Sequence, residues 1–113
     1  LCEVDREKAV ALALVINELL MNAIKHYKFR NGSNSINIAH DHRRGNIILV
    51  ISNPGQLPDG FDFNRGQGLG TGLELASAML PSDGAKLKLY QSGAEVLAEL
   101  EVGPPLLIGV DDF

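Results

Sequence analysis

Residues 4–29 constrain the fold of this sequence more strongly than any other segment. Apolar residues recur there at helical spacing, and Asp5 stands where an N-cap is expected. The pattern therefore predicts one long helix. The same helix carries Asn17, Glu18, Asn22 and Lys25 within an otherwise apolar run. A helix with this mixture of side chains has either a solvated polar face or a functional one.

The polar side chains of this helix are not scattered around it. At about 100° per residue, Glu18, Asn22 and Lys25 fall within an arc of roughly 60°. Apolar residues occupy the opposite side and are predicted to face a sheet: Ala9, Ala13, Ile16, Leu20, Ala23, Ile24 and Tyr27. Taken alone, a polar row of this kind favours a solvated helix face over a site.

The rest of the chain reads as two hairpins separated by glycine-rich loops and a second helix. Strands are predicted at residues 35–42, 47–52, 83–91 and 94–102, glycine-rich loops at 53–60 and 64–72, and a helix at 73–80 that Pro81 stops. This order predicts an α+β fold, a two-layer sandwich with helices on one face of a mixed or antiparallel sheet.

Length, composition and charge limit the classes of protein to consider. The chain has 113 residues, of which 45% are hydrophobic and 21% are charged, so one globular domain is expected. A formal net charge of -4 argues against general nucleic-acid binding. The lone Cys2 cannot form an internal disulfide and fits a reducing, cytoplasmic compartment. No apolar run is long enough to cross a bilayer, so no membrane contact by this domain is expected.

Two features that are weak separately point to a phosphate ligand when they are combined. An Asn amide oxygen is a suitable ligand for Mg²⁺, and a carboxylate one turn earlier can act as a base or orient a nucleophile. Gly68, Gly70 and Gly72 alternate directly before the second helix, where backbone N–H groups and the helix dipole favour an anion. The glycine segment matches neither a Rossmann fingerprint nor a P-loop.

Three segments in the same order resemble the GHKL ATPases, and among them the ATP-binding catalytic domain of sensor histidine kinases. "INELLMNAIKH" resembles the family's N box, "SNPGQLPDGFD" stands at the first glycine box, and "GLGTGLELASAML" resembles the second glycine box. The resemblance spans about residues 4–102. It implies the helix-on-sheet Bergerat sandwich, which agrees with the order of elements, and it implies ATP and Mg²⁺ as ligands.

The resemblance also implies roles for individual residues. Asn22 matches the asparagine that holds Mg²⁺, and Glu18 matches the general base of the hydrolytic members. Lys25 and His26 match polar positions near the phosphates. The remaining residues implied in nucleotide binding are Ser52, Asn53, Gly55, Arg65, Gly68, Gly70, Thr71, Gly72 and Leu73.

This sequence departs from the family pattern in two places. The first glycine box of the family usually opens with an aspartate that accepts a hydrogen bond from the adenine amino group. The residues aligned there are Ser52, Asn53 and Pro54, so Ser52 or Asn53 is expected to supply a neutral, weaker acceptor. The family's ATP lid is usually much longer than the segment here, from which only Arg65 is expected to reach a phosphate.

The function implied is donation of the ATP γ-phosphate to a histidine in two-component signalling. None of His26, His40 and His42 has the helical setting of a phosphoacceptor. The expected partners are therefore a separate helical dimerisation and phosphoacceptor domain and, indirectly, a response regulator. Two alternatives stay open: a serine kinase of the anti-sigma type, and a degenerate module kept for protein docking.

The sequence further predicts where the catalytic domain ends. Residues 1–103 are expected to form the catalytic domain, and residues 104–113 a tail or linker. Alternatively, "LLIGVDD" begins a following receiver domain. Whether the parent protein is anchored to a membrane stays open. So few residues favour the tail.

Overall fold

The computed structural model describes residues 3–25 and 36–108, and it places the elements in the predicted order. The elements are β1 (Glu3–Val4), α1 (Arg6–Lys25), β2 (Asn37–Arg43), β3 (Asn46–Pro54), α2 (Thr71–Met79), β4 (Ala85–Ser92), β5 (Glu95–Val102) and β6 (Leu107–Ile108). The part of the predicted first helix beyond Lys25 lies outside the described residues.

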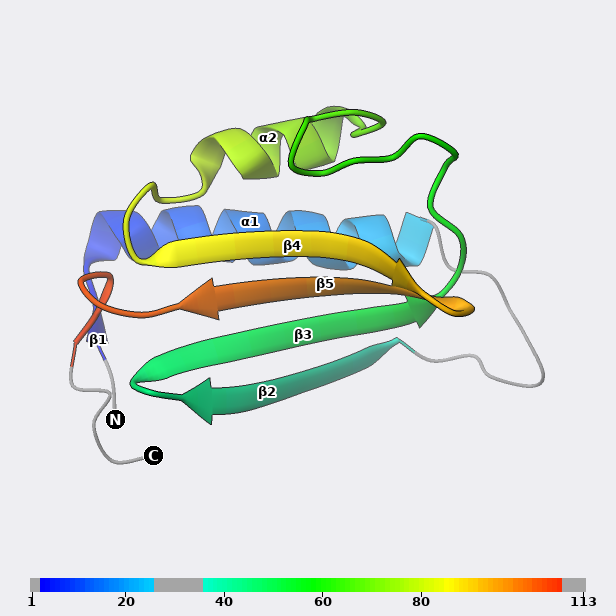
Figure 1. The fold of residues 1–113 in the computed structure, drawn as a ribbon. Coiled ribbons are helices and arrows are strands. Elements are labelled where there is room, and N and C mark those ends of the chain that lie inside the picture. The colour runs from blue at the N-terminus through cyan, green and yellow to red at the C-terminus, as the bar shows by residue number, and fades with distance from the viewer. Residues whose placement is uncertain (1–2, 26–35, 109–113) are drawn as a thin grey trace.

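Four of the strands form an antiparallel sheet in the order β2-β3-β5-β4. Both helices lie on one side of this sheet and pack against each other (Figure 1). Residues of α1, α2 and the strands share one hydrophobic core. The predicted α+β two-layer sandwich is confirmed, and all described strand pairs are antiparallel. No described helix is both long enough and apolar enough to span a lipid bilayer.

The turn between β2 and β3 fixes the register of the first hairpin. Arg44 and Gly45 both have positive φ, 51° and 82°, as a two-residue type I′ turn requires. The strands then pair from Arg43↔Asn46 to Asn37↔Ser52. Because side chains alternate between the two faces of a sheet, this register decides which residues of β3 point toward the helices.

A second, two-stranded sheet was not predicted from the sequence. β1 pairs with β6, joining Glu3 to Ile108 and Val4 to Leu107. Leu106 and Leu107 are buried in the hydrophobic core. These residues follow the boundary predicted at residue 103, so the packed part of the chain extends at least to them. Asp111 and Asp112, at the end of the segment "LLIGVDD", lie outside the described residues.

The buried face of α1 differs from the predicted one. The fully buried positions are Leu12, Val15, Leu19 and Ala23. Of the predicted core positions, Ala23 is buried and Ile16 and Leu20 are half-buried, whereas Ala9, Ala13 and Ile24 are exposed; Tyr27 is not among the described residues. On the helical wheel the buried stripe is turned by roughly 85° toward the polar arc. The cause is α2, which packs against α1 in addition to the sheet and adds a second buried direction.

Candidate functional site

The polar arc of α1 opens into a hollow of about 540 Å³ between α1, the loop after β3 and the start of α2. Glu18, Asn22 and Lys25 line one side of this hollow. The remaining lining residues come from α1, the loops and α2: Met21, Leu57, Pro58, Phe61, Gly68, Leu69, Gly70, Gly72 and Leu73. The N-box helix and the second glycine loop, about 50 residues apart in the sequence, therefore meet at one place.

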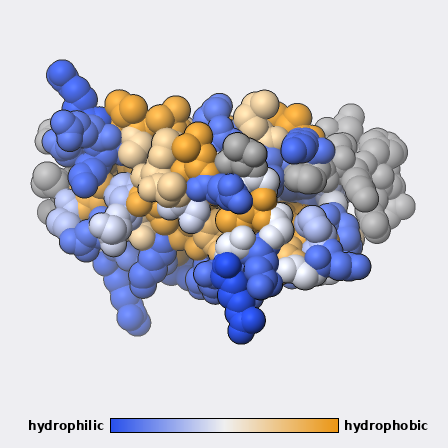
Figure 2. All heavy atoms as spheres, turned by 90° about the horizontal axis from the view of Figure 1, so that it is seen from above, coloured by the Kyte–Doolittle hydropathy of each residue, from blue (hydrophilic) through white to orange (hydrophobic). Residues whose placement is uncertain are grey.

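The rotation of the buried stripe of α1 explains why the polar arc is not simply exposed to solvent. Glu18 and Asn22 are half-buried because they lie at the margin of the buried stripe, whereas Asn17 is exposed. Seen from the side of the helices, apolar groups are interspersed with hydrophilic ones (Figure 2). The prediction that the apolar side of α1 lies opposite the polar arc is therefore wrong, and the correction brings the arc against α2.

The glycine segment forms the other wall of the hollow, and two of its glycines lie in close contact with neighbouring residues. Gly68 has a φ of +79°, and a Cβ there would lie 3.3 Å from Phe61. A Cβ on Gly72 would overlap a carboxylate oxygen of Glu18. The carboxylate of α1 therefore lies directly against the backbone of the first turn of α2.

The N-terminus of α2 is open. Gly70 is its N-cap in an extended conformation, and no side chain caps the helix there. A Cβ built on Gly70 would meet nothing within 4 Å. The first N–H groups of a helix have no partner within the helix and favour an anion. At this end of α2 they adjoin the hollow that Asn22 and Lys25 line.

Replacing Gly68 with alanine is expected to lower the free energy of unfolding by about 1–2 kcal/mol, the cost of a left-handed conformation for a residue with a Cβ. Gly70→Ser is the matched control, because its φ of -82° suits any residue, its surroundings are open and serine is favoured at an N-cap. Urea unfolding of both variants measures the difference. Equal stabilities would show that the segment does not hold Gly68 in this conformation.

A side chain that sequence analysis missed holds the loop after β3. The amide of Gln91 on β4 accepts a hydrogen bond from the Leu57 N–H (2.8 Å) and donates to the carbonyls of Gly55 and Gly93 (both 3.0 Å). Leu57, Pro58 and Phe61 thereby form a wall between the first hollow and a second one of about 700 Å³ beside β4. No sequence motif marks Gln91, because its role depends on the spatial neighbourhood of β4 and this loop.

The second hollow differs in chemistry from the first. It contains Lys88, Tyr90 and Glu99 but no residue of the polar arc and no glycine of the second box. The Tyr90 hydroxyl donates to Glu99 at 2.9 Å, and this bond raises the pKa of Tyr90 above its ordinary value. The first hollow is therefore the candidate site for a phosphate ligand.

The first glycine box divides between the two faces of the sheet. Ser52 pairs with Leu97 and Asn37, so its side chain lies on the face away from the helices. Asn53 pairs with Val96 on the helix-facing side; it is 3% exposed and donates a hydrogen bond to the Pro54 carbonyl at 3.0 Å. Gly55 is buried, and its N–H donates to Ala94. None of Ser52, Asn53 and Gly55 lines the first hollow.

The remaining predicted site residues lie in different places. Gly70, Gly72 and Leu73 line the hollow with Gly68, as stated above. Arg65 does not line it: the Arg65 N–H donates to Asp62, and its guanidinium Nε lies 3.7 Å from the Asp62 carboxylate, in a short loop that the backbone pair Asp62 and Gln67 closes. Thr71 begins α2. His26 lies outside the described residues.

Several solved structures share this architecture, and three of them are histidine kinases or histidine kinase domains by their printed names. The histidine kinase domain of the blue-light activated histidine kinase from Erythrobacter litoralis EL346 superposes with a TM-score of 0.69 at 20% identity, over 88% of this chain and 48% of that one. The fold is that of a histidine kinase catalytic domain. The Acinetobacter baumannii histidine kinase AdeS gives 0.65 at 18% identity, over 84% and 46%. The catalytic domain of histidine kinase ThkA gives 0.68 at 20% identity, over 89% and 69%.

These similarities lie in structure rather than in sequence. No protein-family model matches the chain, and no curated protein matches it. The chain spans about half the length of the Erythrobacter domain and of AdeS. The histidine-kinase fold is therefore established at about 20% identity, while ligands, activity and partners depend on the site itself.

Proposed function

We propose that this chain is the ATP-binding catalytic domain of a sensor histidine kinase of two-component signalling. It would donate the γ-phosphate of ATP to a histidine on a separate helical dimerisation and phosphoacceptor domain, and so act indirectly on a response regulator, in the cytoplasm. The observation that carries the proposal is the meeting of Glu18, Asn22 and Lys25 with the alternating glycines in one hollow.

The residues present fit both Mg²⁺ and a phosphate chain. The Asn22 amide supplies a neutral oxygen, and Mg²⁺ prefers oxygen ligands and retains several waters. The open N-terminus of α2 supplies backbone donors, and Lys25 supplies a cation at the margin of the hollow. When bound, Mg²⁺ would neutralise charge on the phosphates. A volume of about 540 Å³ lies within the range of small-ligand pockets, roughly 300–1,000 Å³.

Glu18 would act by position. Its carboxylate lies against Gly72, at the start of α2, rather than in open solvent. From there it would accept hydrogen bonds from waters around the metal and hold them in place. Phosphoryl transfer depends mainly on positioning and on electrostatic stabilisation, so a carboxylate at this point is sufficient for its proposed role.

Calorimetric titration with ATP and ADP, with and without Mg²⁺, tests the proposal directly. We expect binding that requires Mg²⁺. Absence of nucleotide binding would instead favour a module kept for docking. If ATP binds, incubation with separate histidine-containing helical domains and with serine-containing protein substrates decides between phosphorylation of histidine, which acid hydrolyses, and of serine, which acid leaves intact.

We propose Asn53 rather than Ser52 as the adenine acceptor, because Asn53 lies on the helix-facing side of β3 and Ser52 does not. Asn53 is 3% exposed and lines neither hollow, so this proposal requires the loop after β3 to move when ATP binds. Asn53→Asp is then expected to raise ATP affinity by up to about tenfold, whereas Ser52→Asp leaves it unchanged. A hydrogen bond to a charged group contributes about 1.5–3 kcal/mol against roughly 1 kcal/mol for a neutral one. Each 1.4 kcal/mol corresponds to about tenfold in affinity.

Titration of both variants with ATP and with GTP measures this difference, with GTP binding as the control for base recognition. Weaker ATP binding in Asn53→Asp, with an unchanged unfolding midpoint, would contradict the assignment. Thermal unfolding is measured in parallel, because a buried carboxylate without a ligand destabilises a protein.

A further inference from the structure

Two imidazoles lie side by side on β2, away from the proposed nucleotide site. His40 and His42 are two residues apart on a strand, so their side chains point to the same face. Their ring centroids are 5.6 Å apart and the ring planes are inclined by 38°. Their cross-strand partners are Leu49 and Ile47, which places both rings on the helix-facing side of the sheet.

The two rings are accessible to a ligand from solvent. Every residue of β2 is exposed, and β2 is an edge strand of the four-stranded sheet. Figure 1 shows that α1 and α2 lie over the other strands and leave β2 uncovered. A metal ion could therefore approach both imidazole rings from solvent.

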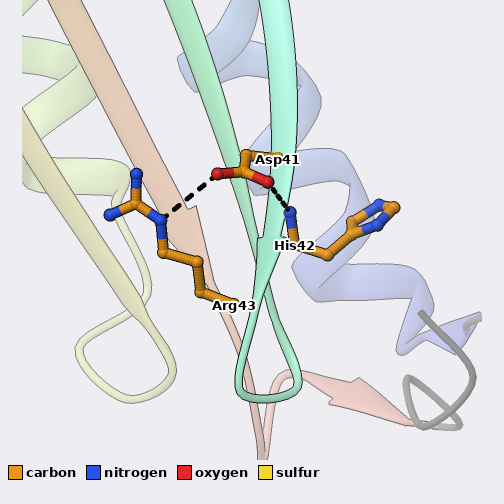
Figure 3. A network of polar contacts seen from close by, with 3 residues as sticks. All are labelled: Asp41, His42 and Arg43. Atoms are coloured by element: carbon orange, nitrogen blue, oxygen red, sulfur yellow. Dashed lines mark hydrogen bonds and ion pairs between the residues drawn. The ribbon is translucent and has the colours of Figure 1, made fainter.

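The backbone between the two rings is held by a polar contact on the opposite face. The Asp41 carboxylate accepts a hydrogen bond from the His42 N–H at 2.8 Å and one from the Arg43 guanidinium at 3.3 Å. Figure 3 shows these contacts, with the His42 ring pointing away from Arg43. Arg43 also offsets the charge of Asp41. The Asp41 carboxylate therefore interacts with Arg43 on the opposite face of the sheet and does not draw a metal ion away from the imidazoles.

The separation of the rings suits one metal ion. Two imidazoles bound to the same tetrahedral ion at about 2.0–2.1 Å per bond place their centroids about 5 Å apart. The observed 5.6 Å requires only a small rotation of exposed side chains. Among the described residues no group of three or more His, Cys, Asp or Glu side chains is placed to hold a metal. A metal at this position would therefore have two protein ligands and would complete its coordination with water or an external donor.

We propose that His40 and His42 form a chelating site for a late first-row divalent metal ion such as Zn²⁺, Ni²⁺ or Cu²⁺. Imidazole nitrogen suits these ions, whereas Mg²⁺ prefers oxygen. The site is thus chemically distinct from the Asn22 position, and the two sites can be occupied independently.

Calorimetry and ¹⁵N-resolved NMR with Ni²⁺ and with Zn²⁺ test the site on the chain without an affinity tag and with Cys2 replaced by serine. We expect one ion per chain, signal changes centred on β2, and no displacement by millimolar Mg²⁺. His40→Gln and His42→Gln should each weaken binding at least tenfold, because either change destroys the chelate. Ile38→His should strengthen binding, since Ile38 is 59% exposed and lies on the same face two residues earlier.

His26→Gln is the matched control, as it removes one imidazole elsewhere in the chain and should leave Ni²⁺ binding unchanged. Retention of parent affinity in both single variants would overturn the proposal. So would binding at half the capacity with unchanged affinity, since that is the behaviour of two independent rings. These outcomes do not depend on whether the chain binds ATP.

Discussion

Replacing Asn22 with alanine is expected to weaken Mg²⁺-dependent ATP binding by roughly 10- to 100-fold while leaving the fold intact. The amide is half-buried in the wall of the 540 Å³ hollow, beside Glu18, and no core volume is lost when it is removed. Loss of a hydrogen bond or ligand contact to a charged group costs about 1.5–3 kcal/mol, which is roughly 10- to 100-fold in affinity. Calorimetric titration with Mg-ATP measures this loss.

Asn17→Ala is the matched control for this variant. It removes the same amide from the same helix, at an exposed position that does not line the hollow. Both variants should keep the parent's circular dichroism spectrum and unfolding midpoint. Parent-like binding of Mg-ATP by Asn22→Ala would rule out the metal role, and equal losses in both variants would point to a general effect on the helix instead.

Replacing Leu19 with alanine is expected to lower the free energy of unfolding by about 2–5 kcal/mol, the range for a fully buried leucine. Leu19 is 2% exposed and belongs to the core cluster formed by α1, α2 and the sheet. Since the free energy of unfolding of a native protein is only about 5–15 kcal/mol, this single change removes a large share of the stability. Urea unfolding followed by circular dichroism measures it.

Two further variants test the orientation of α1. Ile24, which the apolar pattern places in the core, is 59% exposed, and Leu14 is 46% exposed. Ile24→Ala and Leu14→Ala are therefore expected to change stability by no more than about 0.5 kcal/mol. A loss at Ile24 comparable to that at Leu19 would show that the helix is oriented as the sequence pattern alone predicts.

The sequence predicts elements well where a periodic pattern or a turn motif is strong. The long helix, both hairpins and the two-layer architecture follow from such patterns, and the Arg44–Gly45 turn fixes one register. The rotation of α1 does not follow, because it depends on α2, which lies about 50 residues later in the chain. The pairing of β1 with β6 does not follow either, since two residues carry no detectable period.

The same distinction applies to the candidate site. Glu18, Asn22 and Lys25 on α1 and the alternating glycines were predicted as site residues, because each segment carries a local pattern, whereas the lining residues Met21 and Leu69 were not. The face of Ser52 was not, because β3 is apolar on both sides and its sequence does not mark which side meets the helices. The anchoring amide of Gln91 depends on tertiary contacts alone.

The pairing of β1 with β6 has a mechanical consequence. Glu3 and Ile108 are opposite each other, so the chain enters and leaves this small sheet at the same end. A force that pulls Glu3 and Ile108 apart would act on the Glu3–Ile108 pair before the Val4–Leu107 pair. The hydrogen bonds between the two strands would therefore break one after another. In a sheet that is pulled along its strands, all inter-strand hydrogen bonds share the load. The β1–β6 sheet would instead open at low force, because its pairs are loaded one at a time. The β1–β6 sheet would then separate before the four-stranded sheet, whose strands carry far more paired residues.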